Sequence, residues 1–72
     1  MKLICHNSIS EIYDDDEKEN WIWRSKTEGE PDYIWPKNEN PIWPLAAVIK
    51  YGMTPDNNEI LDELRKKAME NF

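Results

Sequence analysis

The sequence has few of the residues on which small folds and reactive sites most often depend. Among its 72 residues there are one cysteine, one histidine and two glycines. One cysteine cannot form an intramolecular disulfide, and Cys5 with His6 supplies too few ligands for a zinc site. An unpaired thiol is typical of a reducing compartment. We therefore expect a soluble, cytoplasmic protein without a metal or cofactor.

Long apolar runs and an excess of basic residues are also missing. The longest apolar run, residues 45–49, is far shorter than the roughly 20 residues that a membrane-spanning helix needs, and the N-terminus lacks the apolar core of a signal peptide. Nine Lys and Arg stand against 15 Asp and Glu, so the net charge is −6. Phosphates and anionic lipids repel such a chain, which disfavours nucleic acid and membranes as partners and favours a basic protein.

The chain is long enough for one small domain, residues 1–72, and for no more. A chain of this size buries only about 60% of the surface that it exposes when unfolded, which disfavours a deep catalytic cleft. Cys5 and His6 do not form a thiol–imidazole pair, because neighbours on a predicted strand over residues 2–6 point to opposite faces. We expect no enzymatic activity.

The tryptophans and prolines gather in residues 33–44, where the triplet Ile-Trp-Pro occurs twice. Pro36 cannot donate a hydrogen bond to a neighbouring strand and predicts the end of one. Pro44 predicts the first residue of a helix, where its missing N–H has no consequence. The stretch is therefore expected to join a β part to an α part.

Alternating residues predict a hairpin at about 21–35, with a turn in the Gly- and Pro-containing loop between its strands. Trp21 and Trp23 are expected on one face, opposite Tyr33 and Trp35 on the returning strand. Residues 9–13 could be strand or helix. The apolar spacing and a capping-box pattern at Ser8 to Glu11 favour one helical turn.

Two helices are predicted at about 44–51 and 55–71, with Gly52 as a left-handed residue between them. Leu45, Val48 and Ile49 are expected to face inward from the first helix. The apolar stripe of the second comprises Ile60, Leu61, Leu64, Ala68 and Phe72. The expected fold is α+β, a small antiparallel sheet from the N-terminal half packed against two C-terminal helices.

Acidic residues dominate positions 14–19, which predicts a solvated loop. The run departs from a calcium-binding EF-hand loop, since Lys18 replaces a ligand and Glu19 replaces the glycine. The two predicted helices have the outline of a helix–turn–helix, but the second one begins with acidic and amide residues that would meet DNA phosphates with the wrong charge.

The features that remain are acidic residues and aromatic anchors, both of which suit binding to a protein. We expect a non-enzymatic protein that binds and inhibits or modulates a larger protein, possibly as a nucleic-acid mimic in a basic groove. Small, acidic chains of this kind are commonly encoded by phages and mobile elements. The alternative is an assembly subunit that forms homo-oligomers through a Trp-rich surface. The candidate partner-binding residues are Asp14, Asp15, Asp16, Glu17, Glu19, Trp21 and Trp43.

Overall fold

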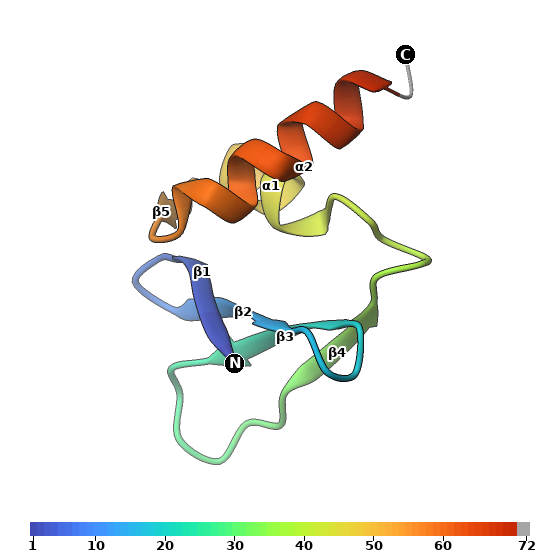
Figure 1. Ribbon diagram of the computed structural model, residues 1–72. Coiled ribbons are helices and arrows are strands. Elements are labelled where there is room, and N and C mark those ends of the chain that lie inside the picture. Colours follow the sequence, from blue (N-terminus) through green and yellow to red (C-terminus); the bar gives the residue numbers. More distant parts are fainter. Residues whose placement is uncertain (71–72) are drawn as a thin grey trace.

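The computed structural model describes residues 1–70 and contains one antiparallel sheet and two helices (Figure 1). The strands are β1 (Lys2–His6), β2 (Ser10–Asp15), β3 (Asn20–Ser25), β4 (Tyr33–Pro36) and β5 (Thr54–Pro55). Their order across the sheet is β4-β3-β2-β1-β5, and every pair is antiparallel. The expected α+β architecture is confirmed.

Helices α1 (Trp43–Lys50) and α2 (Asn58–Glu70) lie together on one face of the sheet (Figure 1). Both pack against β1 and against each other. The main core lies in this layer and comprises Ile4, Cys5, Ile12, Trp21, Ala47, Met53, Leu61 and Leu64. Since the helices cover the β1 side of the sheet, other side chains must cover the β3 and β4 side.

A bulge in β1 changes which residues enter the core. The pairing with β2 shifts between Leu3 and Cys5, so two consecutive residues, Ile4 and Cys5, are both fully buried. A bulge places an extra residue on one strand and interrupts strict alternation. The alternation predicted for neighbours over residues 2–6 therefore fails at Ile4 and Cys5.

The helical turn favoured for residues 9–13 is wrong, because these residues belong to strand β2 and the turn before it. Alternate residues of β2 face the helices, namely Ser10, Ile12 and Asp14, and all three are buried. Two of these three inward residues are polar, so the hydrophobicity of the sequence does not show the alternation of inward and outward residues. The prediction that position 14 begins a solvated loop is also wrong, because Asp14 is a buried residue of strand β2.

The hairpin predicted at 21–35 is confirmed as β3 and β4. Trp21 pairs with Trp35 and Trp23 with Tyr33, so all four rings lie on the predicted face. The strand β4 ends at Pro36, as its missing N–H requires. The opposite face carries a row across four strands, Leu3, Tyr13, Ile22 and Ile34.

Helix α1 begins one residue before the predicted Pro44 and buries Pro44 and Ala47. The inward orientation predicted for Ile49 is wrong, since its side chain is 79% exposed. Ile49 lies two residues, or about 200° of helix rotation, beyond the buried Ala47 and so points to the other side. Gly52 has φ +61°, which confirms the predicted left-handed residue after the helix.

We expect Gly52→Asn to lower the free energy of unfolding by less than Gly52→Val does, with a loss of about 1 kcal/mol or more for valine. A Cβ at this position would meet no atom within 4 Å, so the expected loss comes from the backbone angle and not from a clash. Urea denaturation of the two variants measures the difference. Equal losses would contradict a role for the left-handed conformation.

Helix α2 begins later than the predicted residue 55. Thr54 and Pro55 instead form the short edge strand β5 beside β1, and Asp56 N and Asn57 N both donate to Ile4 O, at 2.8 and 3.0 Å. Asn57 Oδ1 then caps the helix by accepting from Ile60 N at 3.2 Å. The predicted stripe is confirmed at its centre, where Leu61 and Leu64 are buried; Phe72 lies outside the described residues.

Neither helix within residues 1–70 combines the length and the apolar character that crossing a membrane would require.

Candidate functional site

Five aromatic side chains form a cluster over the β3 and β4 side of the sheet, where the helices give less cover. This aromatic cluster comprises Trp23, Tyr33, Trp35, Trp43 and Tyr51. Trp23 contacts three of the other rings, with centroids 6.2 Å from Tyr33, 5.8 Å from Trp43 and 5.5 Å from Tyr51. The cluster connects β3, β4 and α1. It therefore holds the β part and the α part together at residues 33–44, the segment predicted to join them.

Trp43 lies at the centre of this cluster. Its ring stacks on Trp35 with centroids 4.9 Å apart and an interplanar angle of 20°. The indole N–H groups of both residues are buried, and neither has a hydrogen-bond acceptor within the described chain. Trp43 was predicted as an exposed anchor, but it is half-buried and its contacts stabilise the domain itself.

Trp21, the other candidate anchor, is only 3% exposed, so its ring is buried and does not present an anchor at the surface. Its indole Nε1 donates to Asn40 O at 2.6 Å, which ties β3 to the segment before α1. Lys37 Nζ lies 4.5 Å from the centroid of its ring. Trp21 is therefore a structural residue.

The same Lys37 neutralises the first residue of the acidic run. Its Nζ lies 2.6 Å from Asp14 Oδ1 and 3.3 Å from Asp16 Oδ1. Burial of the ammonium would lower the pKa of Lys37, but the hydrogen bonds and charges of Asp14 and Asp16 outweigh it and raise the pKa above its ordinary value. Asp14 is thus committed to a nearly buried ion pair.

The other predicted acidic residues lie at the end of the sheet where β2 turns into β3. Asp16, Glu17 and Glu19 are exposed in the turn and Asp15 is half-buried at the end of β2. Asp14 to Glu17 also line a hollow of about 250 Å³ beside Met1 and Lys2. Four of the five predicted acidic residues are therefore accessible to a partner.

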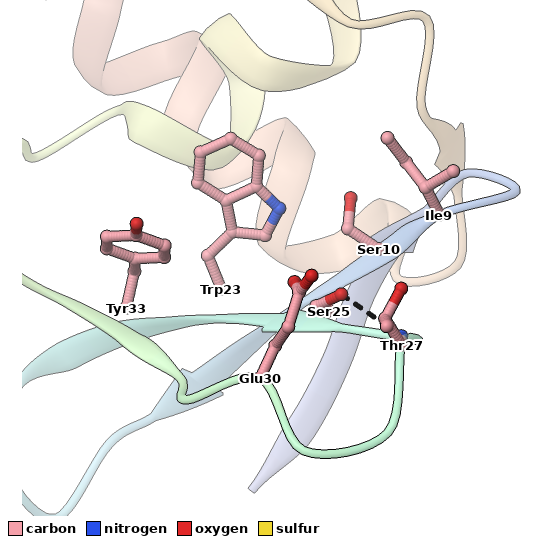
Figure 2. Close-up of a pocket in the computed structure, with 7 residues that line it drawn as sticks. All are labelled: Ile9, Ser10, Trp23, Ser25, Thr27, Glu30 and Tyr33. Carbon is pink, nitrogen blue, oxygen red and sulfur yellow. Dashed lines mark hydrogen bonds between the residues drawn. The ribbon is translucent and has the colours of Figure 1, made fainter.

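A second hollow of about 310 Å³ lies beside the aromatic cluster, at the opposite end of β3 (Figure 2). We call it the Trp23 pocket; it is lined by Ile9, Ser10, Trp23, Ser25, Thr27, Glu30 and Tyr33. Figure 2 shows the rings of Trp23 and Tyr33 standing side by side on the sheet, with the Glu30 carboxylate in front of the hollow. An open hollow with an aromatic wall and a few polar groups is typical of a binding site.

The Trp23 pocket was not predicted from the sequence, although the pairing of two of its seven lining residues was. The cross-strand pair of Trp23 and Tyr33 follows from the hairpin register. Ile9 and Ser10 reach the pocket only because residues 10–15 form a strand, since Ser10 then pairs with Ser25. Glu30 belongs to the hairpin loop, for which the sequence gives no position.

Cys5 and His6 have separate environments, as predicted. Cys5 Sγ is buried 3.7 Å from Met53 Sδ, while His6 Nδ1 lies 2.6 Å from Asp56 Oδ2 near the surface. Burial, with a smaller contribution from the charge of Asp56, raises the pKa of the Cys5 thiol to about 12. Within residues 1–70, no group of three or more potential ligands is placed to hold a metal ion.

Cys5 should therefore resist alkylation in the folded protein. At pH 9 its raised pKa leaves very little thiolate, whereas the unfolded chain has an ordinary pKa near 9.0 and reacts readily. Because only the unfolded state loses this proton, the same difference should lower the stability as the pH rises above 9. Mass spectrometry after iodoacetamide treatment, with and without urea, measures the effect; equal labelling rates would contradict a buried thiol.

The fold and the site together define a small α+β domain with an aromatic pocket and an acidic turn. No family model matches the chain, and no solved structure matches it. Two curated proteins, both named "Chaperone protein HtpG", are each 36% identical to it over 63 residues; they come from Wolbachia pipientis wMel and Wolbachia sp. subsp. Brugia malayi (strain TRS). The match covers 88% of this chain, and the chain spans about 9% of the length of these relatives.

Proposed function

We propose that this chain is a non-enzymatic protein-binding domain that docks on a larger, basic protein and inhibits or modulates it. The observation that carries the proposal is the Trp23 pocket, with an aromatic wall and a carboxylate in front, on a chain of net charge −6. Exposed aromatic side chains beside a hollow are the usual anchors of protein interfaces.

The acidic turn gives the second element of the proposal. Asp16, Glu17 and Glu19 are exposed at the far end of β3 from the pocket, so a partner that reaches both ends would meet negative charge and aromatic surface in turn. Exposed charges attract an oppositely charged partner over about 8 Å at physiological ionic strength and mainly raise the association rate. A basic groove that binds nucleic acid suits this pattern. Docking of this chain would then keep nucleic acid out of the groove.

The similarity to two chaperones supports protein binding as the class of function. Both proteins of similar sequence are named as chaperones, and this chain spans about 9% of their length. The docking mode, the basic partner and the inhibition rest on the residues of this chain.

The test is a comparison of two variants that remove the same charge from different places. Glu17→Gln/Glu19→Gln removes two negative charges from the acidic turn, and Glu63→Gln/Glu70→Gln removes two from α2; each changes the net charge from −6 to −4. Partners captured from lysate with the wild-type chain are measured by surface plasmon resonance at several salt concentrations. We expect the turn variant to associate more slowly and to show a flatter salt dependence than the α2 variant.

Equal association rates for the two variants would show that only the overall charge matters and would contradict docking through the acidic turn. A captured nucleic-acid-binding partner should also lose its nucleic acid when this chain is added. If it keeps its nucleic acid, the mimic part of the proposal is wrong.

A second candidate function, assembly of several copies, is favoured by the sheet face opposite the helices, where Ile34 is exposed and Leu3 and Tyr13 are half-buried beside the buried Ile22. Within residues 1–70, both helices lie on the other face of the sheet, and Ile34 is 61% exposed (Figure 1). Sedimentation of the wild type and of Ile34→Glu distinguishes this function. A dimer that the variant abolishes would favour assembly, and a monomeric wild type would exclude it at the concentration used.

A further inference from the structure

We infer that the Trp23 pocket receives an arginine side chain of the partner. This inference rests on the proposed function and deepens it by naming the group that the pocket recognises. The pocket offers two kinds of surface, aromatic ring faces and oxygen acceptors. A guanidinium group can use both at once, because it is planar, positively charged and carries several N–H donors.

The aromatic wall supplies the first contact. Trp23 and Tyr33 lie 6.2 Å apart between centroids at an interplanar angle of 45°, so their rings form an angled wall instead of a closed stack. Tyr33 is 67% exposed, and Figure 2 shows both rings bordering the hollow. A cation over such ring faces is attracted by their negative π surface, and arginine is the cation found most often in that position.

The hydroxyl groups supply acceptors. Ser10 Oγ donates to Asn7 Oδ1 at 3.0 Å, so its oxygen lone pairs are left for an incoming N–H. Ser25 Oγ accepts one bond, from Thr27 N at 3.0 Å, and has a second lone pair. Two serine oxygens on neighbouring strands can therefore accept from a ligand that donates.

The charge of the lining residues favours a positively charged ligand. Glu30 is exposed at the hollow, and within the described chain none of the seven lining side chains is basic. Lys26 lies in the same loop but is not among the lining residues. A phosphate or carboxylate would be repelled by Glu30 and find no cation, whereas a guanidinium would form an ion pair.

The test titrates the isotope-labelled protein with blocked arginine, N-acetyl-arginine amide, and follows the amide and indole signals by NMR. Blocked citrulline, which has nearly the same shape without the charge, and blocked lysine are the comparison ligands. We expect saturable shifts at Trp23, Ser25 and Thr27 with arginine. Citrulline should bind about five-fold more weakly or worse, because the ion pair and the cation–π contact are both lost.

Two variants and a matched control locate the site. Glu30→Gln should weaken arginine binding about two- to five-fold, and Tyr33→Leu should do the same by removing a ring face while keeping bulk. Glu28→Gln removes the same charge from the same loop at a residue outside the pocket lining and should leave binding unchanged.

Three results would overturn the inference: citrulline binding as well as arginine, lysine binding as well as arginine, or equal effects of Glu28→Gln and Glu30→Gln. Tighter binding of cytidine monophosphate than of arginine, read from the saturation of the titration, would assign the pocket to a nucleobase and also overturn it. The proposed function fails separately. If the turn variant loses nothing against the captured partner while arginine still binds, docking through the acidic turn is wrong and the pocket assignment stands.

Discussion

Leu61→Ala should lower the free energy of unfolding by about 2–5 kcal/mol, as for other leucines removed from a packed core. Leu61 has no exposed surface and lies on α2, where the helix faces Ile4, Cys5 and Met53 in the core cluster. The cavity would lie in the core between the sheet and the helices. A domain of about 70 residues has a total stability of roughly 4–11 kcal/mol, so the loss should be large enough to lower the melting temperature severely.

Met69→Ala is the matched control for this prediction. Met69 is on the same helix and is 76% exposed, so its truncation should change the stability by about 0.5 kcal/mol or less. Urea denaturation followed by tryptophan fluorescence and circular dichroism measures both variants. A loss for Met69→Ala as large as that for Leu61→Ala would mean that α2 packs through a different face.

Lys37→Met should be the most destabilising change of a charged residue, with a loss of about 2–4 kcal/mol. Removing one partner of a buried ion pair costs about 3–5 kcal/mol because the other charge is left uncompensated, and partial exposure of Lys37 reduces that value. The charge left behind is Asp14, whose side chain is 11% exposed, against 22% for Lys37. The variant also loses the contact of the ammonium with the Trp21 ring.

Two controls separate this ion pair from a general effect of charge. Lys18→Met removes a charge from the neighbouring turn at an exposed residue and should change the stability by about 0.5 kcal/mol or less. In the double variant Lys37→Met/Asp14→Asn, part of the loss should return, because no buried charge remains. A double variant as unstable as the sum of the two single variants would contradict direct coupling.

The pH dependence provides a further check on Lys37. Its pKa is raised in the folded protein, so the ion pair contributes fully below the ordinary lysine value of 10.5. The contribution is lost as the pH rises through the raised value and Lys37 loses its proton. The difference in stability between the wild type and Lys37→Met should therefore be constant from pH 7 to 10 and become smaller above pH 10.5.

Much of the architecture could be predicted from local patterns. The hairpin followed from the alternation of Trp21 and Trp23 and from the stop at Pro36, both of which depend on backbone chemistry within a few residues. The stripe on α2 and the left-handed Gly52 followed in the same way, because helical period and backbone freedom are local properties. These features fixed the α+β class and the face of the sheet on which the aromatic rings lie.

Strand β2 could not be predicted because its inward polar residues are satisfied by partners from other segments. Asp14 is neutralised by Lys37, which lies 23 residues later in the sequence, and Ser10 is held by Asn7. A hydrophobicity pattern registers such residues as outward-facing, although the fold has made them tolerable inside. The start of α2 was displaced for a comparable reason, since residues 54 and 55 pair with the edge of β1.

The sequence by itself determined the charge of this protein, its α+β class and the two segments that supply its aromatic rings, because each depends on composition or on near neighbours. Only the tertiary structure decided which rings are available to a partner. Trp21 is buried in the core, where its indole N–H donates to Asn40 O, and the ring of Trp43 stacks on that of Trp35. The pocket arose where β2, β3 and the hairpin loop bring Ser10, Trp23 and Glu30 together, and contacts between segments so far apart are set by strand register and packing, which no local pattern encodes.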